Sequence, residues 1–113
     1  MVSLDVSVST AIDIYFPAQA ASSPSAILVS TGFEVVSTPR RLPSGASGVE
    51  HRCTLRGASF TLTESQLPND SSYIYLLGLA SSESVSALVR ARDVLMEHGA
   101  LDASQYASRT RHV

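Results

Sequence analysis

The 113-residue chain has no Lys and no Trp, and no apolar run approaches the roughly 18 residues that a membrane-spanning helix needs. All of its basic residues are Arg; they are scattered, and the net charge is −2, so broad nucleic-acid binding is not expected. Residues 1–5 lack the basic and apolar regions of a signal peptide. We therefore expect a cytoplasmic protein with no nucleic-acid or membrane partner.

The chain has only one cysteine, Cys53, so it has neither an internal disulfide nor a CxxC metal pair. Cys53 alternates onto an apolar strand face, which favours a small buried hydrophobic residue over a reactive thiol in electropositive, accessible surroundings. With 44% hydrophobic and 16% charged residues, the composition is that of a globular protein. The length predicts a single domain, residues 1–113, with a real core.

Residues 49–65 predict a β-hairpin with Gly57-Ala58 as the central residues of a type II′ turn. In that register Leu55 faces Phe60 and Cys53 faces Leu62. These four side chains form an apolar face, and a one-residue slip would mix them with polar ones. The opposite, polar face then carries Arg52, Thr54, Arg56, Thr61 and Thr63.

Residues 2–16 alternate apolar side chains at even positions, which predicts one long strand or two strands of the same parity, ended by Pro17. Ser23 and Pro24 are typical of the start of a short helix, which Gly32 ends. Further along, we expect a strand at 33–37 and flexible loops at 39–48 and 67–72.

Residues 73–79 are apolar on both faces and predict an interior strand. A helix should follow, from Ser81 or Ser82 to about His98, with Gly99 at its end. Arg92 lies within its apolar stripe, either with its stem on the core edge or in a buried pair with a sheet carboxylate; we favour the first. The tail, residues 102–113, shows no apolar periodicity and should be frayed or used between subunits.

The element order predicts an α+β fold, with a mostly antiparallel sheet and helices on one face. The order and several phrases also resemble the vicinal oxygen chelate superfamily (glyoxalases, bleomycin-resistance proteins and dioxygenases). TGFEVVSTP at 31–39, SFTLTES at 59–65 and MEHGA at 96–100 carry the likeness. It implies a βαβββ module at 11–65 and a partial second module at 73–99. Residues 1–10 would be an N-terminal strand extension.

The resemblance implies a concave sheet that holds ligands on its inner face, with helices outside. The family's metal ligands would fall at Ala11, Thr61 and Tyr73, none of them a normal ligand, so no metal or other cofactor is expected. The truncated second module implies a homodimer that completes the cavity. The implied ligand-binding set is Asp13, Tyr15, Arg52, Thr54, Arg56, Thr61, Thr63, Tyr73 and Tyr75. Alternatively, this polar face is simply the solvent side of the sheet.

These side chains suit binding more than catalysis, because Arg binds carboxylates or phosphates and Tyr stacks on planar groups. The first hypothesis is metal-independent sequestration or sensing of a planar or anionic small molecule. The alternative is a protein–protein interaction module, such as an immunity protein, adaptor or regulatory subunit. A lesser alternative is a lyase or isomerase with Asp13 or Glu64 as base.

The predicted hairpin register also places His51 opposite Glu64, at the open end of the apolar face. A His–carboxylate pair can form part of an acid–base site. At this position, however, a cross-strand ion pair that closes the core is the favoured interpretation. The sequence shows no nucleophile with an evident base.

Overall fold

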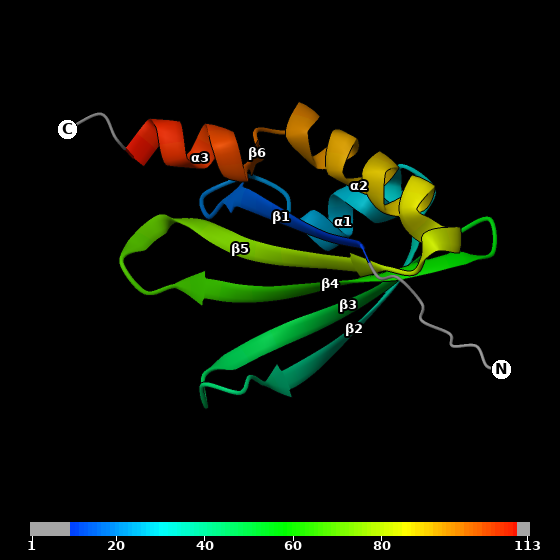
Figure 1. Cartoon of the computed structure of the whole chain (residues 1–113), viewed down its shortest axis with the longest axis horizontal. Helices are drawn as coiled ribbons and strands as arrows, with labels where there is room; N and C mark the ends of the chain where they lie inside the picture. Colours follow the sequence, from blue (N-terminus) through cyan, green and yellow to red (C-terminus); the bar gives the residue numbers. More distant parts are fainter. Residues whose placement is uncertain (1–9, 111–113) are drawn as a thin grey trace, which may run out of the picture.

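The computed structural model describes residues 10–110, in which six strands form one antiparallel sheet of order β2-β3-β4-β5-β1-β6 (Figure 1). The strands are β1 (Thr10–Pro17), β2 (Glu34–Arg41), β3 (Ser47–Leu55), β4 (Ala58–Leu67), β5 (Asp70–Ala80) and β6 (Leu101–Asp102). The helices are α1 (Pro24–Ser30), the short 3-10 turn η1 (Ser82–Ser84), α2 (Val85–Glu97) and α3 (Ala103–Thr110). The α+β prediction is confirmed.

The core lies between one face of the sheet and the helices α1 and α2 (Figure 1). Even-numbered residues of β1 point into it, as the alternation predicts. Even-numbered residues of β5 also point into it, and β5 is the predicted interior strand, between β4 and β1. The predicted extension at residues 1–10 falls almost wholly outside the described residues. The largest fully buried side chains are Phe16, Ile14, Leu28, Leu62, Leu76, Leu88, Leu95 and Cys53.

The predicted start of α1 and the predicted end of α2 are confirmed at their key residues. The predicted cap of the second helix at Ser81 or Ser82 is wrong, because Ser82–Ser84 form a 3-10 turn, Ser81 makes no side-chain cap hydrogen bond, and α2 begins at Val85. The Ser23 side chain caps α1 by accepting a hydrogen bond from the Ala26 N–H at 3.2 Å, and Pro24 is the first helical residue. After α2, Gly99 adopts a φ of +101°, which favours glycine. Arg92 pairs with its neighbour Asp93 at 3.2 Å and not with a sheet carboxylate, so the buried-pair alternative is wrong.

The hairpin register differs from the predicted one. Arg56 and Gly57 form the turn with φ of 53° and 84°, a type I′ geometry, and Cys53 faces Phe60. Type I′ matches the twist of the paired strands, which outweighs the cost of a left-handed Arg. Moving the turn by one residue moves each partner by two positions. The apolar and polar faces are therefore unchanged.

Two predicted loops are shorter than expected, because hairpin pairing extends into them. Pro39 lies inside β2, an edge strand where its missing N–H is tolerated, and only residues 42–46 form the loop. Only Pro68 and Asn69 separate β4 from β5.

The prediction of a frayed tail is wrong, since residues 101–110 form β6 and α3, while its use in contacts between subunits stays a prediction. The Asp102 carboxylate accepts from the Gln105 N–H at 2.7 Å. The Gln105 side chain accepts from the Asp102 N–H at 3.0 Å. This reciprocal capping fixes the start of α3 without any apolar periodicity.

Gly78 gives a test of core packing. A Cβ added there would lie 2.7 Å from Leu88 Cδ1, so Gly78→Ala should destabilise the protein by about 1–3 kcal/mol through overpacking. Leu88→Val removes the clashing Cδ1, so Gly78→Ala should cost less in that background. Urea unfolding of both single variants and the double variant measures the coupling. Strictly additive effects would contradict the proposed contact.

Candidate functional site

The predicted ligand-binding residues gather on the sheet face opposite α1 and α2, which we call the open face. Arg52 pairs with Thr61, which pairs with Leu79, while Tyr15 pairs with Tyr75. Thr54, Thr63, Tyr73 and Asp13 have the same parity on their strands. Arg56 alone differs, because it lies in the β3–β4 turn at one end of the face.

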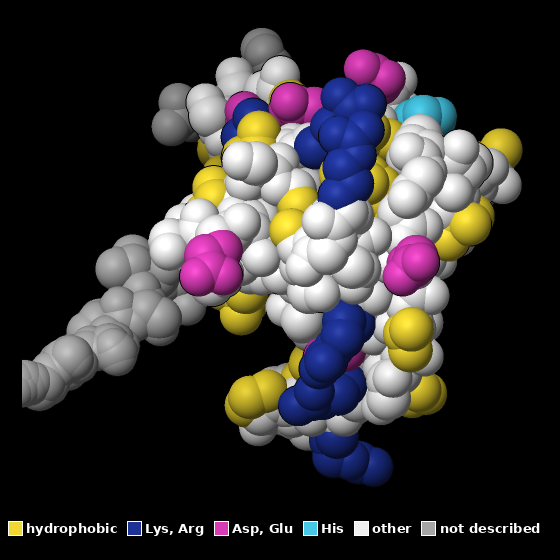
Figure 2. Space-filling view, turned by 90° about the vertical axis from the view of Figure 1, so that its right-hand side faces the viewer, with side chains coloured by type: hydrophobic (Ala, Val, Ile, Leu, Met, Phe, Trp, Pro, Cys, Tyr) yellow, Lys and Arg dark blue, Asp and Glu magenta, His cyan; other side chains and the backbone are white. Residues whose placement is uncertain are grey.

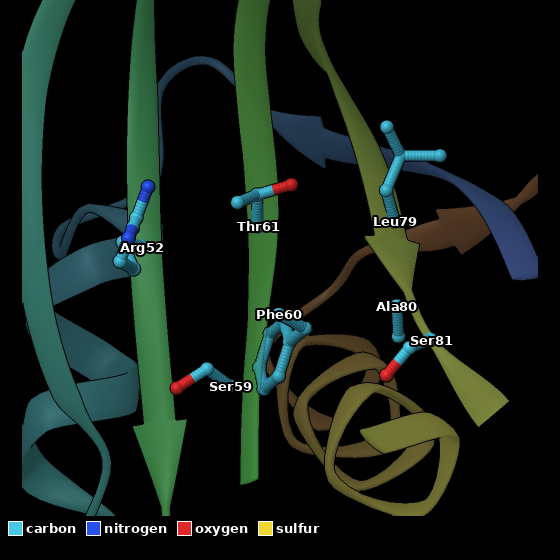
Figure 3. Close-up of a pocket in the computed structure, with 7 residues that line it drawn as sticks. All are labelled: Arg52, Ser59, Phe60, Thr61, Leu79, Ala80 and Ser81. Carbon is cyan, nitrogen blue, oxygen red and sulfur yellow. The ribbon is translucent and has the colours of Figure 1, made fainter. Parts of the chain in front are cut away.

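Two hollows adjoin each other at Arg52. The first encloses about 300 Å³ and is lined by Arg52, Ser59, Phe60, Thr61, Leu79, Ala80 and Ser81 (Figure 3). The second encloses about 390 Å³ and is lined by Val36, Thr38, Arg40, Glu50 and Arg52. Both are open to solvent, and Arg52 is common to them.

The electrostatics around Arg52 leave its guanidinium available. Glu50 forms an ion pair with Arg40 and lies 3.8 Å from Arg52, measured between Oε2 and Nη2. The Arg52 side chain is 67% exposed, and this long contact is its only ion pair among residues 10–110. Seen from the end with the β3–β4 turn, Arg side chains form a broken band with acidic groups beside it (Figure 2). The Arg52 guanidinium can therefore accept a further anionic partner.

At the other end of the open face the tyrosines contact one another and α3. Tyr106 of α3 stacks on Tyr15 with ring centroids 4.1 Å apart and an interplanar angle of 5°. Tyr106 also meets the Tyr73 ring edge-on at 5.7 Å, and the Arg109 guanidinium lies 4.6 Å from the Tyr73 centroid. A planar ligand that stacks at this place on Tyr15 would have to displace Tyr106.

Hydrogen bonds and burial set the pKa values in this tyrosine cluster. Burial, together with the hydroxyl hydrogen bond to Asp13, raises the pKa of Tyr75. The Tyr106 hydroxyl donates to Asp70 at 2.6 Å, which lowers the pKa of Asp70 and raises that of Tyr106. Burial raises the pKa of Tyr15, and the Asp13 charge adds to this. The Tyr75 and Tyr106 hydroxyls therefore keep their protons and donate to Asp13 and Asp70.

A second constellation lies on the opposite, helix-facing side. His51, 5% exposed, binds Glu64 through Nε2 at 2.8 Å and the Ser37 hydroxyl through Nδ1 at 2.7 Å. The expected His51–Glu64 contact is present, but diagonally, because His51 faces Leu62. Ser37 was not expected there. The sequence indicates which side of its strand Ser37 lies on, but it does not give the pairing register of β2 with β3 across the loop.

Cys53 lies two residues from His51 on the same side of β3 and is fully buried. Its thiol donates to the His51 carbonyl at 3.7 Å, and burial raises its pKa to about 12. The protonated thiol is a poor nucleophile. Cys53 therefore acts as a core residue, as expected.

No protein-family model, curated protein or solved structure matches this chain. Among residues 10–110, no three His, Cys, Asp or Glu side chains gather as a metal site would require. No helix in this part of the chain is both long enough and apolar enough to span a membrane. The site must therefore be interpreted from its own geometry.

Acid should loosen the contact of α3 with the open face. The lowered pKa of Asp70 means that its ionised form stabilises the docked state above the ordinary Asp value of about 3.9, and this contribution is lost as pH falls through the folded value. Tyr106→Phe keeps the ring but removes the hydroxyl donor, so the Asp70 pKa should rise toward its ordinary value. NMR titration of the Asp70 carboxyl carbon measures this.

Ser104→Ala, an exposed change on the same helix, is the matched control and should leave the Asp70 pKa where it is in the unaltered protein. An identical Asp70 titration in the Tyr106→Phe protein would contradict the assigned hydrogen bond.

Proposed function

We propose that the protein is a metal-independent binding protein that captures a small anionic molecule on its open face through Arg52. The observation that supports this most directly is the exposed Arg52 guanidinium between two adjoining hollows, held only loosely by Glu50. The vicinal oxygen chelate resemblance also implies ligand binding on this face. In this proposal the protein sequesters or senses its ligand in the cytoplasm.

The surroundings of Arg52 favour a ligand with both an anionic and an apolar part. Its guanidinium can donate two parallel hydrogen bonds to a carboxylate or phosphate. Thr61 and Ser59 add hydroxyl groups, while Leu79, which is 40% exposed, supplies apolar surface in the same hollow. Hollows of about 300 Å³ are at the lower end of ligand-pocket sizes, which favours a small molecule.

The open face supports binding more than lyase or isomerase chemistry. Asp13, the candidate base on this side, accepts a hydrogen bond from the Tyr75 hydroxyl at 2.5 Å. That bond already engages one carboxylate oxygen of Asp13 within the tyrosine cluster. Glu64, the other candidate, lies on the opposite side with His51.

Arg52→Ala should weaken binding of a small aromatic carboxylate such as benzoate at least tenfold, about 1.4 kcal/mol, because a charge-assisted pair is lost. Native mass spectrometry would report any retained ligand, and an NMR titration with benzoate would measure the dissociation constant. Arg90→Ala, an exposed change on α2, is the control and should bind normally. If Arg52→Ala and Arg56→Ala both bind benzoate as the unaltered protein does, the proposal fails.

A second candidate is that the open face pairs two copies of this chain. Val36 and Leu79 are large apolar side chains left 65% and 40% exposed, and they lie in the same row across the sheet as Arg52. Apolar side chains around an Arg are typical of protein interfaces. A second copy would also close the two hollows, as the homodimer expectation requires.

Val36→Asp should then shift the dimerisation constant at least tenfold toward monomer, because a carboxylate would be buried against apolar groups. Light scattering across a concentration series measures this constant. Val29→Asp is the matched control, since Val29 is also a largely exposed valine but lies on α1, away from the open face. A protein that stays monomeric at every concentration excludes this candidate while leaving Arg52 binding open.

A further inference from the structure

Ser37, His51 and Glu64 form a hydrogen-bonded chain across three neighbouring strands, on the side of the sheet away from the open face. Ser37 of β2 is directly opposite His51 of β3, and Glu64 of β4 is diagonal to His51. The Ser37 Oγ–His51 Nδ1 and His51 Nε2–Glu64 Oε1 distances are 2.7 Å and 2.8 Å. A hydroxyl, an imidazole and a carboxylate are thus joined in the order that activates a serine nucleophile.

The direction of the proton in this chain follows from what each group can do. The Glu64 carboxylate only accepts hydrogen bonds, so it fixes the proton of a neutral His51 on Nε2. His51 Nδ1 is then the acceptor, and the Ser37 hydroxyl donates to it. In this tautomer the imidazole is oriented to remove the Ser37 proton, and Glu64 stabilises the imidazolium that results.

The serine, unlike the histidine, is accessible. His51 is buried, whereas Ser37 lines a solvent-open hollow of about 340 Å³ with Ser25, Ala26, Val29 and Val35. Val29 is 55% exposed there, and no charged side chain lines the hollow. Its walls therefore suit a short, uncharged acyl group next to the hydroxyl.

The strand edge supplies a backbone donor at the same place. Leu42 N–H binds the Ala46 carbonyl, which sets the even-numbered residues of β2 as the hydrogen-bonded positions with β3. Ser37 and Pro39 are at the alternate positions, whose amides turn away from β3, and Pro39 has no N–H to lose there. Because β2 is an edge strand of the sheet that residues 10–110 form, the Ser37 N–H faces no other strand of this part of the chain.

We propose that Ser37 is the nucleophile of a second, hydrolytic site that takes small uncharged carboxylic esters. Ser37 Oγ attacks the ester carbonyl carbon while its proton passes to His51 Nδ1, and the Ser37 N–H stabilises the oxyanion. The carbon–oxygen bond to the alcohol then breaks, and the alcohol leaves with the proton from His51. Water, deprotonated by His51, attacks the acyl-serine, releasing the carboxylic acid and restoring the Ser37 hydroxyl.

In this assignment Ser37 and His51 are catalytic residues, while Glu64 is a positioning residue that acts through His51. The site is independent of Arg52 and of the open face, so neither proposal requires the other. A purely structural role for the chain would give the same hydrogen bonds, but Ser37 would then react no faster than any other exposed serine. Its reactivity is therefore the property to measure.

The first experiment treats the folded protein with a fluorophosphonate, which phosphonylates an activated serine hydroxyl with loss of fluoride and a proton. Intact and peptide mass spectrometry should show one adduct, on Ser37. Ser37→Ala should abolish the adduct, and Ser86→Ala, which changes an exposed serine of α2 outside this hollow, should retain labelling. Urea-unfolded protein should not label, because unfolding removes the hydrogen bonds that join Ser37, His51 and Glu64.

The second experiment follows hydrolysis of p-nitrophenyl acetate. His51→Gln should lower kcat by about 100-fold or more, the usual loss of a general base. Glu64→Gln keeps an acceptor for His51 but loses the charge, so kcat should fall while KM stays the same, a split that loss of structure would not give. Circular dichroism checks that each variant is folded.

Labelling and hydrolysis that depend on Ser37, His51 and Glu64 establish the site. The proposal is overturned if the folded protein gives no adduct, if Ser25 or other serines label equally, or if Glu64→Gln hydrolyses the ester at the normal kcat. Benzoate binding through Arg52 can succeed or fail in either case, so the two proposals are judged separately.

Discussion

The alternation of side chains along the six strands is the constraint on which the rest of the structure depends. The strands β1, β3, β4 and β5 each place one set of residues against α1 and α2 and the other set outward. Burial of apolar surface, at about 25 cal/mol per Å², is the main favourable contribution to the free energy of folding. Any register shift that exchanged the two sets would therefore destabilise the protein. The open face and the His51 chain follow from this separation.

The polar chain through His51 shows how the core ends at one corner of the sheet. His51 shares the apolar side of β3 with Cys53 and is only 5% exposed, so its two ring nitrogens need partners within the protein. Ser37 and Glu64 satisfy both imidazole nitrogens, so His51 can be buried without an unpaired polar atom. The same two bonds that allow burial also orient the ring, which links packing with potential chemistry.

The helix α3 covers one end of the open face and leaves the other end exposed. At one end Tyr106 stacks on Tyr15, and the Arg109 guanidinium lies over the Tyr73 ring. Asp70 accepts a hydrogen bond from Tyr106 and forms an ion pair with Arg109. At the other end Arg52 remains exposed between its two hollows. The tyrosines therefore belong to the internal packing of α3, whereas the Arg52 guanidinium stays exposed.

The sequence by itself determined the α+β class, the core parity, the helix caps at Ser23 and Gly99, and the common face of Arg52, Thr61, Tyr15 and Tyr75. These features depend on local periodicity and on residues with strong conformational preferences. Only the tertiary structure decided the hairpin turn at Arg56-Gly57, the docking of α3 and the meeting of Ser37 with His51. Each depends on pairing between distant segments, whose register no local pattern specifies.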